Sequence, residues 1–102
     1  MNPMEHHLYV AFIERGKSYN RMTGELARRH VAHIRDMDDQ GLVALCGAFR
    51  GYPGVAGMYI LKVESREEAE ALCRADPLVA EGYATYKVRD LLVANRENNY
   101  LL

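Results

Sequence analysis

The segment from Ala27 to Gly41 reads ARRHVAHIRDMDDQG. Its apolar residues recur at the spacing of about 3.6 residues that is typical of an amphipathic helix. Together with its flanks it predicts a helix over residues 20–40 that begins near Thr23 or Glu25, with Gly41 ending it at positive φ. The face predicted to be buried carries, in angular order, Leu26, Met37, His30, Ile34, Ala27 and Val31.

His30 is the unusual member of that apolar face. A buried imidazole loses its hydration unless it finds hydrogen-bond partners. A carboxylate that accepts from one ring nitrogen would fix the tautomer and make the other nitrogen a better base, as in general acid–base catalysis. A core histidine bonded to a backbone carbonyl fits the same pattern, and helical periodicity alone leaves both interpretations open.

The flanking segments predict four strands and a second helix, with strands at residues 8–13, 42–49, 55–63 and 83–88. Ser65 and Glu68 have the spacing of a capping box, so a helix is expected to begin there. Gly47 inside the second strand is expected to allow a bulge or a close backbone approach. The order β-α-β-β-α-β is that of an α+β, ferredoxin-like fold, in which an antiparallel four-stranded sheet carries both helices on one face.

Asp76 is expected to end the second helix, because the residue before Pro77 is biased away from helical geometry. An aspartate in this position is a natural N-cap for a short turn that closes at Gly82. It is also a candidate partner for His30. The two roles are compatible, because one carboxylate oxygen can cap the turn while the other is directed elsewhere.

The chain of 102 residues is expected to form one domain, with a core over residues 8–92 and a tail over 93–102. One face of the sheet would lack helices. Tyr9 and other strand residues look too apolar for water, so we expect a second copy to cover this face or an edge of the sheet, giving a homodimer.

Composition excludes several classes of partner. With 13 basic and 14 acidic residues, the net charge of -1 argues against nucleic-acid binding. No apolar run approaches the roughly 18 residues of a membrane span, and residues 1–7 lack a signal-peptide pattern, so a cytoplasmic protein is expected. No glycine-rich phosphate loop is found, and no cofactor is expected. Cys46 and Cys73 are expected to be buried, reduced thiols.

Weaker candidates surround His30. His33 lies close enough on the helix to share a metal ion with it, but no further ligands follow at a supporting spacing, so no metal is expected. Cys46 and His30 would make a nucleophile–base pair, although a strand cysteine usually serves packing. Loop residues that would bind an anionic or polar substrate, or simply be solvated or packed, are Arg15, Arg50 and Tyr52.

Three short motifs in order give the sequence a family resemblance. Ten residues separate His30 from Gly41-Leu42 and four more precede Gly47; then come Glu67-Glu68-Ala69, and Asp76-Pro77 with four residues before Gly82. This pattern resembles the YCII-related family of the dimeric α+β barrel superfamily.

The resemblance implies that His30 and Asp76 form a His–Asp active-site pair. It also implies a homodimeric, enzyme-like protein, similar to muconolactone isomerase and related proteins of aromatic degradation. The expected chemistry is cofactor-free isomerisation, elimination or hydrolysis of lactones or aromatic-degradation intermediates. A non-catalytic ligand-binding or regulatory module is the alternative. The chain departs from the family pattern at Ala48, where proline is frequent, and at Leu78, where an aromatic residue is common.

Overall fold

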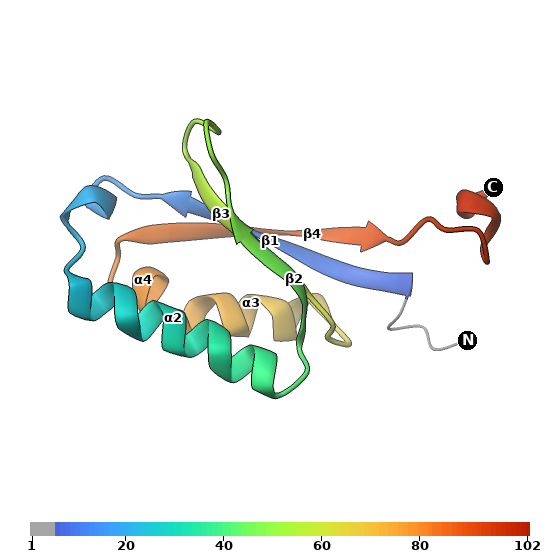
Figure 1. Cartoon of the computed structure of the whole chain (residues 1–102), viewed down its shortest axis with the longest axis horizontal. Coiled ribbons are helices and arrows are strands. Elements are labelled where there is room, and N and C mark those ends of the chain that lie inside the picture. Colours follow the sequence, from blue (N-terminus) through green and yellow to red (C-terminus); the bar gives the residue numbers. More distant parts are fainter. Residues whose placement is uncertain (1–5) are drawn as a thin grey trace.

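The computed structural model describes residues 6–102, and its sheet has the predicted ferredoxin-like topology. The four antiparallel strands lie in the order β2-β3-β1-β4 and comprise β1 (His7–Arg15), β2 (Val43–Ala48), β3 (Val55–Leu61) and β4 (Ala84–Leu92). The helices α2 (Gly24–Asp39), α3 (Arg66–Ala75) and α4 (Pro77–Ala80) lie together on one face of this sheet (Figure 1). Two 3-10 turns that were not predicted are η1 (Tyr19–Arg21) and η2 (Asn99–Leu101).

Local capping signals place the ends of the two long helices where they were predicted. The side chain of Thr23 accepts a hydrogen bond from the backbone N–H of Leu26 at 3.1 Å, so it is the N-cap of α2. Gly41 follows α2 with φ +75, a conformation that glycine adopts without strain. Ser65 caps α3 by accepting from the N–H of Glu68 at 3.1 Å.

The core lies between the sheet and the helices. In the register of β1 and β3, Tyr9 pairs with Leu61 and Ala11 pairs with Tyr59, and all four side chains are buried in this core. The expectation that Tyr9 lies on the uncovered face of the sheet is therefore wrong. Val31 was predicted to be buried, but it is 48% exposed on the outer side of α2.

None of the helices of residues 6–102 covers the opposite face of the sheet (Figure 1). This face is apolar along β1 and β3, whereas β4 adds Lys87 and Arg89 to it. Successive side chains of a strand point to opposite faces, so Val10 and Phe12 of β1 face away from the core. Their cross-strand partners are Ile60 and Met58 of β3. None of the helices formed by residues 6–102 has the length and apolar character of a membrane span.

Strands β2 and β3 approach each other closely where two glycines meet. A Cβ on Gly57 would lie only 2.4 Å from the carbonyl oxygen of Gly47, so a side chain there would force the strands apart. The predicted close approach is present, but Gly57 is the residue that needs to be glycine. This approach shapes one wall of the cavity described next.

The prediction that residues 1–7 carry no signal peptide lies, for residues 1–5, outside the described part of the chain. His7 opens β1, where it pairs with Leu92 of β4.

Candidate active site

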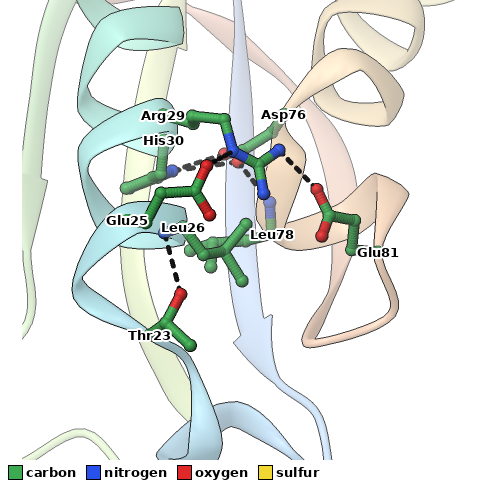
Figure 2. A network of polar contacts seen from close by, with 8 residues as sticks. All are labelled: Thr23, Glu25, Leu26, Arg29, His30, Asp76, Leu78 and Glu81. Carbon is green, nitrogen blue, oxygen red and sulfur yellow. Dashed lines mark hydrogen bonds and ion pairs between the residues drawn. The ribbon is translucent and has the colours of Figure 1, made fainter.

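The fold brings His30 of α2 into contact with Asp76, which lies at the junction of α3 and α4 (Figure 2). Nδ1 of His30 lies 2.9 Å from Oδ1 and 2.8 Å from Oδ2 of Asp76. The carboxylate is completely buried, whereas the imidazole is 23% exposed. An ionised carboxylate only accepts hydrogen bonds, so Nδ1 is the donor. Nε2 is left as the ring nitrogen available for chemistry.

Asp76 has a capping role as well. Its Oδ1 accepts from the backbone N–H of Leu78 at 2.9 Å, which makes it the N-cap of α4, and Pro77 occupies the first turn of that helix (Figure 2). The two roles expected of Asp76 therefore occur together. The cap holds the carboxylate in a direction from which it reaches His30.

Tyr59 is a third partner of the carboxylate, and it was not predicted. Its hydroxyl donates a short hydrogen bond to Oδ2 of Asp76. A signal was present in the sequence, because Tyr59 is the only residue with a polar group among the inward positions 55, 57, 59 and 61 of β3. A buried tyrosine hydroxyl usually finds a partner. Sequence alone did not show that this partner is Asp76.

Hydrogen bonding keeps Asp76 ionised despite its burial. Burial acts to raise the pKa of Asp76, but the hydrogen bonds from His30 and Tyr59, the charge of His30 and the N–H of Leu78 outweigh it and hold this pKa below its usual value. Burial, followed by the charge and the hydrogen bond of Asp76, raises the pKa of Tyr59 far above the usual range. Asp76 is therefore a stable acceptor, and Tyr59 a permanent donor.

Arg29 forms two ion pairs close to the contact between His30 and Asp76. Its Nε lies 2.7 Å from Oε1 of Glu25 on the same helix, and its Nη1 lies 2.5 Å from Oε2 of Glu81, just beyond α4 (Figure 2). These groups are solvent-exposed, and such pairs contribute little to overall stability. Their effect is local, because they connect the helix that carries His30 to the turn that follows Asp76.

A pocket of about 230 Å³ lies beside His30 and Tyr59. Most of its walls are apolar, and the strand residues on one side are small. The residues that line it are Ile13, Tyr19, His30, Ile34, Cys46, Gly47, Ala48, Ala56, Gly57, Met58, Tyr59 and Leu78. An apolar pocket with a few polar groups is the usual form of a site for a small organic molecule. The His30 side chain in this pocket is of the type that most often serves as a general acid or base.

The two cysteines differ from each other. Cys73 is fully buried as expected, and burial raises its pKa to about 12. Cys46 was also expected to be buried, but it is exposed and lies on the pocket wall with His30. The reason is its place in the sheet, because β2 is an edge strand whose outer side has no neighbour among the described strands. The proposed nucleophile–base pair of Cys46 and His30 stays a prediction.

His33 has a structural contact. Its Nε2 donates to the backbone carbonyl of Leu72 at 2.8 Å, which joins α2 to α3. Within residues 6–102 no group of three or more histidine, cysteine, aspartate or glutamate side chains is arranged to hold a metal ion.

The three weaker substrate-binding candidates lie outside the set of residues that line the pocket. Nη1 of Arg15 donates to the carbonyl oxygens of Tyr52 at 3.3 Å and Val55 at 3.1 Å, and its guanidinium lies 5.5 Å from the centre of the Tyr19 ring. Arg15 is thus next to a pocket residue. Arg50 and Tyr52 are exposed in the β2–β3 turn, and Tyr52 packs on Phe49. Their role in binding stays a prediction.

Several solved chains match this fold, and one of them matches over most of both chains. It is 5-chloro-2-hydroxyhydroquinone dehydrochlorinase (TftG) from Burkholderia phenoliruptrix, in complex with 2,5-dihydroxybenzoquinone. The two chains are 16% identical with a TM-score of 0.59, and the match covers 90% of this chain and 99% of the other. At this identity the likeness shows the fold alone.

The sequence itself places the chain in a family. No curated protein shows significant similarity to it. The model of the YCII-related domain matches residues 7–92, a span that contains both His30 and Asp76. The matched span is most of the chain. The match agrees with the family that the sequence motifs resemble. The chain belongs to the YCII-related domain family.

Proposed function

We propose that this protein is an enzyme that moves a proton on a small organic molecule, with His30 as the general acid–base and Asp76 as the residue that orients it. The observation that carries this proposal is the contact between Nδ1 of His30 and the buried carboxylate, 2.8 Å away, at the wall of an apolar pocket. A base oriented by an acid is the usual arrangement in general acid–base catalysis.

In the proposed reaction Nε2 of His30 accepts a proton from a carbon or oxygen atom of the substrate. Asp76 keeps its negative charge and stabilises the imidazolium that forms. Return of the proton to another atom gives isomerisation, and its return to a departing group gives elimination. If the proton comes instead from a water molecule, the water oxygen attacks a lactone carbonyl carbon, the ring carbon–oxygen bond breaks, and the departing oxygen takes the proton from His30, which gives hydrolysis. Each outcome uses one side chain as both base and acid, so the chemistry calls for no cofactor.

The pocket supports a small, mainly apolar substrate. Its small strand residues Gly47, Ala48 and Gly57 leave a wall without long side chains, which suits a flat ring. The structurally similar dehydrochlorinase is named for a chlorinated hydroxyhydroquinone and was solved with a dihydroxybenzoquinone. We propose ring compounds of this kind, together with lactones and dienelactones, as the substrates to screen.

A second candidate function is ligand binding without chemistry, in a binding or regulatory module. One observation favours it: Asp76 is already explained by its cap on Leu78, so its presence needs no catalytic role. Under this alternative a compound from the screen raises the melting temperature but is recovered unchanged.

We also propose that the protein acts as a homodimer in which a second copy covers the apolar face of the sheet. The support is the adjacent apolar set of Val10, Phe12 and their cross-strand partners, on a face that none of the helices of residues 6–102 covers. The unpaired thiols of Cys46 and Cys73 suit a reducing compartment such as the cytoplasm.

The test is turnover by three proteins: the wild type, His30→Gln and His33→Gln. His33 lies on the same helix and donates to a backbone carbonyl away from Asp76, which makes it the matched control. On a compound that the wild type converts, His30→Gln should lose on the order of 10²- to 10⁴-fold in rate, whereas His33→Gln should keep it. Unchanged turnover by a folded His30→Gln protein would contradict the proposed mechanism.

A further inference from the structure

Tyr59 contacts both members of the His30–Asp76 pair. Its hydroxyl donates to Oδ2 of Asp76, and its ring centre lies 6.5 Å from that of His30, with the two planes tilted by 33°. The side chain is only 3% exposed and comes from the middle of β3. Its position is therefore fixed, because the side chain is packed in the core between the sheet and the helices.

The carboxylate of Asp76 accepts hydrogen bonds from groups in three different secondary-structure elements. Oδ1 accepts from the N–H of Leu78 in α4, Oδ2 accepts from the hydroxyl of Tyr59 in β3, and both oxygens lie within reach of Nδ1 of His30 in α2. The backbone cap holds one oxygen, and the tyrosine holds the other. Without the tyrosine, the carboxylate would be free to turn about the capped oxygen and change its approach to His30.

The hydroxyl also disperses the negative charge of Asp76. A carboxylate that already accepts a hydrogen bond attracts another proton less strongly. We propose that Tyr59 is a positioning residue of the site, which orients Asp76 and weakens the hold of the His30–Asp76 pair on its proton. As a role in catalysis, this inference rests on the proposed function. As a statement about the pair, it can be tested without a substrate.

Tyr59 lines the pocket, where a hydroxyl could in principle donate a proton directly to a substrate. Its hydroxyl proton is already committed to Asp76. Burial, and then the neighbouring carboxylate, raise the pKa of the phenol far above the usual range, so the proton stays on Tyr59. Tyr59 therefore acts through Asp76 and is no general acid.

Within residues 6–102, the other ionisable side chains that act on Tyr59 are two thiols. Besides Asp76, the groups that raise the pKa of Tyr59 are the thiols of Cys73 on α3 and Cys46 on β2. Neither thiol is altered when the tyrosine hydroxyl is removed. A change in the titration of the pair on such a removal is therefore attributable to the hydroxyl itself.

The test is a pH titration of ¹⁵N-histidine-labelled protein followed by NMR, with the His30 signal assigned by its loss in His30→Gln. The variant is Tyr59→Phe, and the matched control is Tyr86→Phe, whose hydroxyl accepts from Arg74 at 3.2 Å. We expect the titration midpoint of the pair to rise by about one pH unit in Tyr59→Phe, as for the loss of one charge-assisted hydrogen bond. It should be unchanged in Tyr86→Phe. An unchanged midpoint in folded Tyr59→Phe would overturn the inference.

A second measurement covers the case in which Tyr59→Phe fails to fold. Biosynthetic replacement of tyrosine by 3-fluorotyrosine keeps the ring and makes the hydroxyl a stronger donor, so the midpoint should move to lower pH. A midpoint that stays the same or rises would overturn the inference. If the midpoint moves as expected but no compound is converted, the inference about the pair stands and the proposed enzymatic function fails.

Discussion

Nδ1 of His30 lies 2.8 Å from Oδ2 of Asp76, although 46 positions separate the two residues in the chain. Neither residue would be near the other without the packing of α2 against α4. The contact leaves one nitrogen of the imidazole for the pocket, and it places a buried negative charge under that ring. Both consequences can be measured.

Asp76→Asn should destabilise the protein. An amide cannot carry the charge that pairs with His30, and its NH₂ group would face donors in place of an acceptor. Hydrogen bonds to charged groups contribute about 1.5–3 kcal/mol each, so we expect a loss of about 3 kcal/mol in the free energy of unfolding, measured with urea. The control is Asp90→Asn, which removes an exposed partner of Arg66 and should cost less than about 1 kcal/mol. Equal stabilities of the two variants would contradict the role given to Asp76.

The contribution of Asp76 to stability should depend on acid pH. Its pKa in the folded protein lies below the ordinary value of 3.8, so the unfolded chain takes up a proton more readily than the folded chain. The resulting stabilisation is fully present above the ordinary value and is lost as the pH falls through the folded one. The difference in unfolding free energy between wild type and Asp76→Asn should therefore shrink as the pH is lowered below about 4. A difference that stays constant down to the acid transition would show that Asp76 is not held ionised.

The two thiols should react at very different rates. Cys46 is exposed on the pocket wall, whereas Cys73 is fully buried and burial raises its pKa to about 12. Because the thiolate is the reactive form, iodoacetamide at pH 8 should alkylate Cys46 and leave Cys73 unmodified until the protein unfolds. Mass spectrometry of the alkylated peptides gives the site, and Cys46→Ser should show no rapid labelling. Rapid modification of Cys73 in the folded protein would contradict the packing of α3.

A charge on the apolar sheet face should break the proposed homodimer. Ile60→Glu places a carboxylate opposite Val10, on the part of the face that a second copy would cover and where burying a charge is costly. Light scattering after size exclusion should give the mass of a dimer for the wild type and that of a monomer for this variant. The matched control is Ala32→Glu on the exposed side of α2, which should stay dimeric. A wild-type monomer, or a dimeric Ile60→Glu protein, would contradict the proposal.

Local features of the sequence predicted the parts of the fold that depend on local chemistry. Thr23, Ser65 and Gly41 mark helix ends because each acts on backbone groups within four residues of itself. The fold class followed from the order of the elements, and the family motifs indicated the His30–Asp76 pair.

The predictions that were wrong or missing concern features that depend on distant parts of the chain. The face that Tyr9 occupies is set by the register of β1 against β3, because a shift of one residue exchanges the two faces of a strand. Cys46 is exposed because β2 lies at the edge of the sheet. The bond from Tyr59 to Asp76 joins two elements whose relative position only the tertiary structure determines.

Catalysis by His30 requires that Asp76 hold the proton on Nδ1 and leave the lone pair on Nε2. The most direct measurement is the ¹⁵N spectrum of the His30 imidazole at about pH 9, where an imidazole is normally neutral. We expect Nδ1 to carry the proton and Nε2 to carry none, and we expect this preference to be lost in Asp76→Asn. A proton on Nε2 and a bare Nδ1 in the wild-type protein would contradict the proposed site.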